Sequence, residues 1–79
     1  MLEVSDKNMV IGLKHSKRAL EEGRAACVFI AMDADEHIKD GILRICKETD
    51  IPVVFADTMK ELGESCQIDV GCAVAAELR

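Results

Sequence analysis

A continuous apolar segment at residues 25–32 most constrains what this chain can fold into. It reads Ala-Ala-Cys-Val-Phe-Ile-Ala-Met, so neither side of an extended strand would present a polar side chain to water. An uninterrupted apolar run of this length is typical of a strand that is covered on both faces. We therefore expect a sheet with helices on each side of it. The chain has 79 residues, which predicts a single domain over 1–79.

The rest of the chain alternates further strands with helices. Strands are predicted at 9–12, 25–32, 53–56 and 68–78, and helices at 13–22, from Asp33 to about Glu48, and from Thr58 to about Ser65. Alternating elements of this size predict an α/β fold, a three-layer α/β/α sandwich around a four-stranded sheet.

Capping residues indicate where the predicted helices begin and end. Asp33 and Glu36 have the spacing of a capping box, Thr58 and Glu61 have it again, and Gly23 is a stop signal for the first helix. The side chains expected to face inward are Leu13 and Leu20 on the first helix and Ile38, Ile42, Ile45 and Cys46 on the second.

Charge is distributed unevenly along the chain. The net charge is −5, yet residues 7–24 carry five cations against two anions (net +3), whereas 25–79 carry five against eleven (net −6). The basic residues of the first predicted helix directly follow Gly12 and are Lys14, His15, Lys17 and Arg18. Because a helix N-terminus already has unpaired N–H groups and the positive end of the dipole, cations there predict an anion site, and phosphate-rich ligands fit it best.

A plainer interpretation of the same helix is a solvated face held by the ion pairs Lys17–Glu21 and Arg18–Glu22, at four-residue spacing. Aromatic residues are only 3% of the chain, which argues against binding of single strands by base stacking.

The acidic segment after the apolar run offers a second chemistry. Asp33 and Asp35 form a D-x-D that is similar to the haloacid dehalogenase phosphotransferases, but that chemistry needs distant residues on a much longer chain. Helix capping is the simpler role for this segment. No nucleophile motif or phosphate-binding loop is present, so we predict no enzyme activity, no metal and no cofactor.

Cysteine usage and hydropathy indicate the cellular compartment of the protein. No C-x-x-C occurs, Cys27 and Cys46 lie in apolar patterns typical of core residues, and we expect no functional disulfide between Cys66 and Cys72. No apolar run approaches membrane-spanning length, so the expectation is a cytoplasmic protein without a membrane partner.

Four segments together resemble the kink-turn RNA-binding family of ribosomal proteins, most closely its small bacterial paralogues. The likeness covers roughly residues 8–78. It is carried by Gly12, Lys14, His15, Arg18, Ala19 and Leu20; by Ile30, Ala31, Asp33, Ala34 and Asp35; by residues 51–53; and by Lys60, Leu62, Gly63, Cys66, Ile68 and Val70.

The resemblance implies a mixed four-stranded sheet and a ligand, an RNA helix bent sharply by a bulge next to tandem sheared G·A pairs. It implies that Gly12, Lys14, His15 and Arg18 address the G·A bases and phosphates. Asp35 would orient basic side chains, and the loop at Ile68, Asp69 and Val70 would cover the bulged nucleotides. The partner would be an RNA that contains a kink-turn, and ribosomal RNA or the ribosome is one source of it. We expect the protein to be a monomer.

A protein-interaction module is the competing hypothesis. Its contact face would be the acidic side of the long helix, formed by Asp35, Glu36, Asp40, Glu48 and Asp50.

Overall fold

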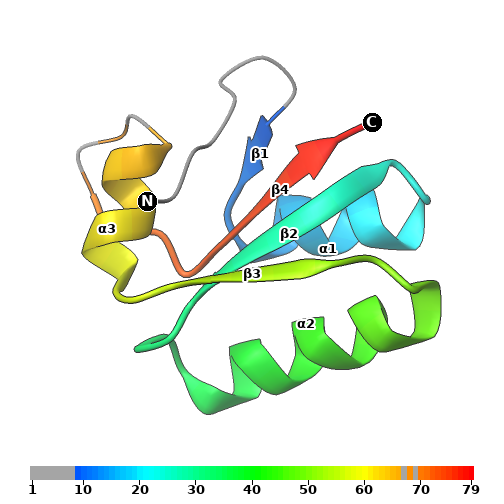
Figure 1. Ribbon diagram of the computed structural model, residues 1–79, viewed down its shortest axis with the longest axis horizontal. Coiled ribbons are helices and arrows are strands. Elements are labelled where there is room, and N and C mark those ends of the chain that lie inside the picture. The colour runs from blue at the N-terminus through cyan, green and yellow to red at the C-terminus, as the bar shows by residue number, and fades with distance from the viewer. Residues whose placement is uncertain (1–8, 67, 69) are drawn as a thin grey trace.

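The computed structural model describes residues 9–66, 68 and 70–79. Within them, strands and helices alternate along the chain (Figure 1). They are β1 (Met9–Ile11), α1 (Leu13–Glu21), β2 (Ala25–Ala31), α2 (Glu36–Thr49), β3 (Val53–Ala56), α3 (Met59–Ser65) and β4 (Val74–Leu78).

The strands form one mixed sheet in the order β1-β4-β2-β3. The last strand, β4, lies between β1 and β2 and runs antiparallel to both, whereas β2 and β3 are parallel. A strand in this position is covered by neighbours on both edges and by helices on both faces. Val74, Ala75 and Ala76 suit it because they are small and apolar, and all three are fully buried.

Helices cover both faces of this sheet, which confirms the three-layer sandwich. The first core lies between the sheet and α1 with α2, and includes Leu20 and Ile42. The second lies between the sheet and α3, and includes Leu62. Neighbouring residues of β2 alternate between the two cores, with Val28 in the first and Phe29 in the second. This is why the apolar segment has no polar interruption.

The start of α2 differs from the sequence prediction. The helix begins at Glu36, and its N-cap is Asp35, whose Oδ1 accepts a hydrogen bond from the His37 amide at 2.8 Å. Asp33 instead accepts from the Met59 amide at 2.7 Å and so satisfies the first turn of α3. The predicted Asp33–Glu36 capping box is therefore wrong, because Asp33 lies in a turn that faces a different helix.

Other helix ends agree with the prediction. Thr58 is the N-cap of α3, and its hydroxyl accepts from the Glu61 amide at 3.0 Å. Gly23 follows α1 with φ +71°, the left-handed conformation that glycine adopts without strain. The Gly23 and Arg24 amides donate to the carbonyls of Leu20 and Ala19, a pairing that closes the helix end.

The last strand is shorter than predicted and begins at Val74 rather than at residue 68. Two amides of the preceding segment bond to α3 instead of to a neighbouring strand. The Ile68 amide donates to the Gly63 carbonyl at 3.1 Å, and the Cys72 amide donates to the Met59 carbonyl at 2.9 Å. The small apolar side chains of this segment fit either a longer β4 or a segment packed on α3. The two hydrogen bonds to α3 favour the second arrangement.

Gly63 provides a test of how closely α3 packs on this segment. A Cβ added at Gly63 would overlap the backbone carbonyl oxygen of Val70, whereas a Cβ at Gly41 in α2 would enter open space. We expect Gly63→Ala to lower the free energy of unfolding by about 1–3 kcal/mol despite the better helix propensity of alanine. The matched Gly41→Ala should raise it by about 0.5–1 kcal/mol. Urea unfolding of both variants is the measurement, and equal effects would contradict the packing described here.

Candidate nucleic-acid interface

Three segments meet near the end of the sheet where β4 begins, and α1 runs from there back along the sheet, toward the right in Figure 1. They are the start of α1 (residues 12–18), the turn after β2 (residues 32–35) and the segment before β4 (residues 70–73). We call them together the sheet-end face. They meet because β1 and β2 end where the antiparallel β4 begins.

Backbone hydrogen bonds hold the three segments together. The Gly12 amide donates to the Val74 carbonyl at 2.9 Å, and the Ala31 amide donates to the Ala73 carbonyl at 2.9 Å. The first bond ties the entry of α1 to the start of β4. The second ties the end of β2 to the residue before it, so the face is fixed by the sheet.

Gly12 is the N-cap of α1 and adopts φ +100°, a conformation that L side chains rarely take. Its carbonyl accepts the first helical bond, from the Ser16 amide at 3.0 Å. Within residues 9–66, 68 and 70–79, no side chain accepts a hydrogen bond from this end of the helix. The amides of residues 13–15 are therefore left available to a ligand, and a hydrogen atom in place of a side chain lets that ligand approach the backbone.

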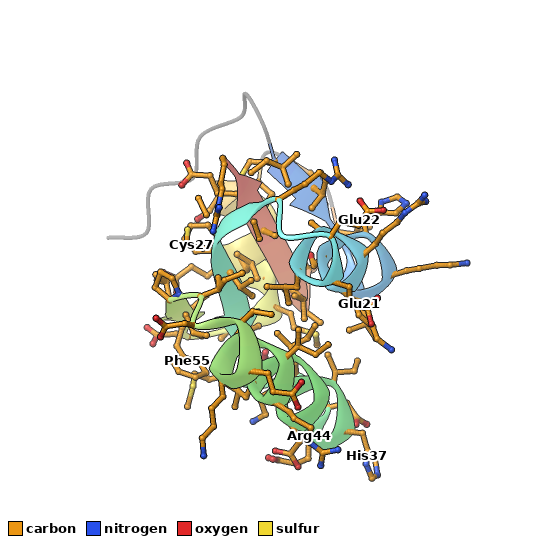
Figure 2. All side chains as sticks on the ribbon, turned by 90° about the vertical axis from the view of Figure 1, so that its right-hand side faces the viewer. Glu21, Glu22, Cys27, His37, Arg44 and Phe55 are labelled. Carbon is orange, nitrogen blue, oxygen red and sulfur yellow. The ribbon has the colours of Figure 1, made fainter. Side chains whose placement is uncertain are left out.

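The predicted basic side chains lie together on the exposed side of α1. Lys14, His15, Lys17 and Arg18 are all exposed and line one shallow depression along the helix. The opposite side buries Ser16, Ala19 and Leu20. Nitrogen-tipped side chains project from α1 away from the sheet in Figure 2. The prediction that these residues share a face is confirmed. The prediction that Leu13 faces inward is confirmed only in part, since it lies opposite the apolar side of α2 but remains 38% exposed.

One of the two expected ion pairs on α1 is present. Arg18 Nε lies 3.2 Å from Glu22 Oε2, and Arg24 Nε lies 2.8 Å from Glu22 Oε1. The hydrogen bond from Arg18, together with the charge and hydrogen bond of Arg24, lowers the pKa of Glu22. Among the ion pairs of the described residues, Lys17–Glu21 does not occur, so Lys17 keeps its charge free of that partner.

Hydrogen bonds from α2 and α3 hold the turn at 32–35. Lys39 Nζ donates to the Met32 carbonyl at 2.7 Å, and Asp33 and Asp35 each accept a backbone amide, as described above. In the parts of the chain that the structure covers, no group of three or more His, Cys, Asp or Glu side chains could hold a metal ion. The recorded partner of the Asp35 carboxylate is the His37 amide, so its orienting action on basic side chains stays a prediction.

Two described apolar side chains between α3 and β4, Ile68 and Val70, were predicted to contact nucleotides, and only Val70 is exposed. Val70 is 69% exposed, whereas Ile68 is half-buried and packs against the core on the α3 side. Asp69 lies outside the described residues. Of the two described side chains predicted to cover a nucleotide, Val70 is thus the exposed one, and its role stays a prediction.

Comparison with known proteins assigns the family. Residues 2–79 match the model of the ribosomal protein L7Ae/L30e/S12e/Gadd45 family. The chain belongs to this family. It is 44% identical to a protein of Caldanaerobacter subterraneus subsp. tengcongensis over 99% of this chain and 95% of that relative. It is 45% identical to one of Geobacillus stearothermophilus over 90% of this chain and 87% of the relative. Both relatives are named RNA-binding proteins, the second YbxF.

Two solved structures share the fold of this chain. The Giardia lamblia 15.5kD RNA binding protein superposes with a TM-score of 0.85 at 27% identity, covering 92% of this chain and 62% of that one. A protein of unknown function from Bacillus halodurans also superposes with a TM-score of 0.85, at 22% identity over 92% of this chain and 73% of that one. The second likeness shows the fold alone. No helix in the described residues is long and apolar enough to cross a membrane.

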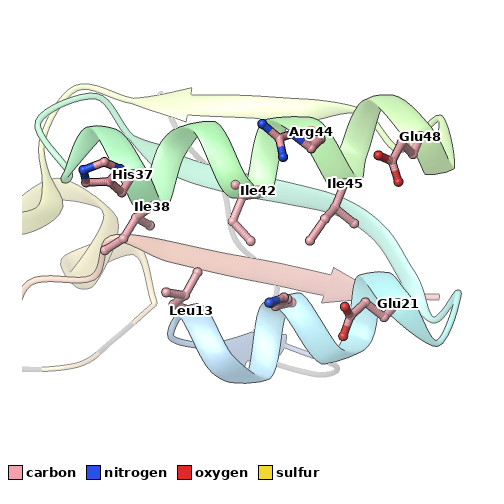
Figure 3. Close-up of a pocket in the computed structure, with 10 residues that line it drawn as sticks. Leu13, Glu21, His37, Ile38, Ile42, Arg44, Ile45 and Glu48 are labelled. Carbon is pink, nitrogen blue, oxygen red and sulfur yellow. The ribbon is translucent and has the colours of Figure 1, made fainter.

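Sequence reasoning missed a groove between α1 and α2 (Figure 3). It has a volume of about 480 Å³, and exposed Leu13 forms part of its apolar floor. Gly41 leaves room on the α2 side because it has no side chain. The further lining residues are Lys17, Glu21, His37, Ile38, Ile42, Arg44, Ile45 and Glu48. A glycine in the middle of a helix facing an apolar helix start was the sequence signal for it.

The four cysteines are free thiols. Cys46 is buried as predicted, while Cys27 is half-buried and its thiol lies 3.6 Å from a carboxylate oxygen of Glu77. Beneath the sheet-end face, Cys72 lies buried and its thiol donates to the Val74 carbonyl at 3.0 Å. Burial raises the pKa of Cys66 to about 11, and the neighbouring Cys72 thiol contributes to this increase.

Asp33 gives a stability test of the turn after β2. Asp33→Ala removes the acceptor of the Met59 amide, and we expect it to lower the free energy of unfolding by about 0.5–2 kcal/mol. Asp33→Asn keeps an oxygen at the same position and should cost only a few tenths of a kcal/mol. Urea unfolding distinguishes the two, and an equal loss in both would show that the hydrogen bond contributes nothing.

Cys66 predicts a pH dependence of stability. Because its pKa of about 11 in the folded protein exceeds the ordinary 9.0, the native state binds this proton more tightly than the unfolded chain does. The contribution is complete below about pH 9 and is lost as the pH rises toward 11. Urea unfolding at pH 8 and pH 10.5 should show a smaller loss for Cys66→Ala than for the unaltered protein. Identical losses would contradict the raised pKa.

Proposed function

We propose that this protein is a non-enzymatic RNA-binding protein that recognises kink-turns with its sheet-end face. The observation that carries the proposal is the uncapped start of α1, with only basic residues among the charged side chains of its first two turns. Curated relatives named RNA-binding proteins support the ligand class. The exposed Val70 at the same end of the sheet supports a ligand that spans more than one segment.

A kink-turn gives protein side chains access to the major groove of RNA. The major groove of an A-form RNA helix is too deep and narrow for side chains to read, and a sharp bend opens it. We propose that α1 then enters with Gly12 against the backbone, so that phosphate oxygens reach the amides of residues 13–15. Lys14 and Lys17 would neutralise phosphates, His15 would donate or accept one hydrogen bond, and Arg18 would fork onto a guanine edge.

Binding of this kind needs no chemical step. A protein that contacts only the bent RNA shifts the population of bent molecules by its difference in affinity for the two forms. We propose that the protein acts in this way as a monomer, and that ribosomal RNA is one source of its ligand, in keeping with the ribosomal proteins in its family.

The competing acidic docking face on α2 has less support from the charges. Residues 35–50 carry the five acidic residues predicted for that face, but also three basic ones, Lys39, Arg44 and Lys47. The net charge of the segment is therefore −2, and Lys39 pairs with Glu36 at 3.1 Å. By contrast, α1 from Leu13 to Glu21 carries three cations and one anion.

Arg18→Ala tests the proposal. Loss of a forked base contact should weaken binding to a kink-turn RNA by about 1–3 kcal/mol. Lys47→Ala, which removes one exposed charge from the far end of α2, should have little effect. Binding is measured by gel shift in magnesium, with an unbent duplex of the same composition in parallel. Equal affinity of the unaltered protein for the bent and unbent RNAs would overturn the proposal.

A further inference from the structure

Arg18, which lines the basic depression, and Arg24 bind the same carboxylate, that of Glu22. Glu22 is the C-cap of α1, and its two carboxylate oxygens accept separately from Arg18 and Arg24. His15, Arg18, Glu22 and Arg24 also line one shallow surface hollow at this end of the helix. Arg18, Glu22 and Arg24 are 44–75% exposed, so the ion pairs of this cluster contribute little to folding stability.

The geometry determines which donors of Arg18 stay free. Glu22 takes the Nε–H of Arg18 at 3.2 Å. No second partner of the guanidinium is present within the residues described. Its terminal Nη amino groups are therefore available, and these can form forked contacts with a guanine edge or a phosphate.

The backbone beneath the cluster is fixed. The Arg24 amide donates to the Ala19 carbonyl at 2.9 Å, and the Arg24 carbonyl accepts from the Arg79 amide at 2.8 Å. The first bond closes the end of α1, and the second ties it to the end of the chain beside β4. Glu22 lies between these anchored residues, so its carboxylate has a defined place from which to restrain Arg18.

We propose that Glu22 is a positioning residue of the RNA-binding face, which holds the Arg18 guanidinium by its Nε–H so that the Nη groups meet RNA in a restricted orientation. This inference rests on the proposed function. A long, exposed side chain loses rotamer freedom when it binds, and a restraint present before binding reduces that loss. The carboxylate would thus favour binding of a polyanion even though it is itself an anion.

The proposal and simple electrostatics predict opposite changes in RNA affinity when Glu22 is removed. Removal of an anion beside a basic face should strengthen binding to RNA if charge alone matters. If Glu22 positions Arg18, its removal should weaken binding. Glu21 provides the matched control, because it is exposed, carries the same charge and borders both the basic depression and the α1–α2 groove (Figures 2 and 3). Among the described residues it forms no ion pair with Arg18.

The experiment measures affinity for a kink-turn RNA and for an unbent duplex, using the full chain. Glu22→Ala should weaken kink-turn binding by about two- to tenfold, the range expected for releasing one restrained side chain. Glu21→Ala should leave it unchanged or strengthen it. Glu22→Gln, which keeps an oxygen acceptor without the charge, should lie between Glu22→Ala and the unaltered protein. Thermal melts followed by circular dichroism check that each variant is folded.

A double-mutant cycle separates positioning from a general effect of charge. In the Arg18→Ala background, Glu22→Ala should no longer weaken binding, because there is no guanidinium to restrain. If Glu22→Ala strengthens kink-turn binding as much as Glu21→Ala does, or still weakens it without Arg18, this inference alone is overturned. If the unaltered protein shows no preference for the kink-turn, the proposed function fails and the inference fails with it.

Discussion

The insertion of β4 between β1 and β2 is the constraint on which the rest of the structure depends. Because β4 runs antiparallel to both neighbours, its start lies beside the ends of both. The Gly12–Val74 hydrogen bond is the local result of this arrangement. It brings the entry of α1 next to the segment that follows α3, although some sixty residues of chain separate them. Small residues make the arrangement possible, since β4 is packed on both faces.

The charge distribution gives that end of the sheet a chemistry that the whole chain lacks. With a net charge of −5, the protein as a whole should repel a polyanion. Lys14 and Lys17 can nevertheless attract a polyanion, because they lie in the first turns of a helix whose free amides carry the same sign of partial charge. Arg18 lies in the last turn, where it borders the same depression. At physiological ionic strength, charges more than about 8 Å away are largely screened, so the acidic residues elsewhere weigh less on the face itself. We therefore regard the surface as selective for a shaped anion rather than for nucleic acid in general.

The sequence predicted what local pattern decides. The apolar segment located β2, Gly23 marked the end of α1, and four-residue spacing identified the Arg18–Glu22 pair. What it could not predict depends on tertiary contacts. Asp33 accepts from an amide 26 residues away, at the start of α3. Capping-box spacing had predicted that it caps α2. The segment before β4 suited a strand in composition, but the amides of Ile68 and Cys72 bond to α3. The second arginine on Glu22 was missed because its position is set by the turn that closes α1.

Backbone amide chemical shifts during titration with a kink-turn RNA test the central claim most directly. If the sheet-end face binds the RNA, the perturbed amides should fall in residues 12–18, 32–35 and 70–73, on three segments far apart in the sequence. Titration with an unbent duplex of the same composition should perturb them much less at equal concentration. Perturbations confined to α2, or the same pattern and affinity with both RNAs, would contradict the account.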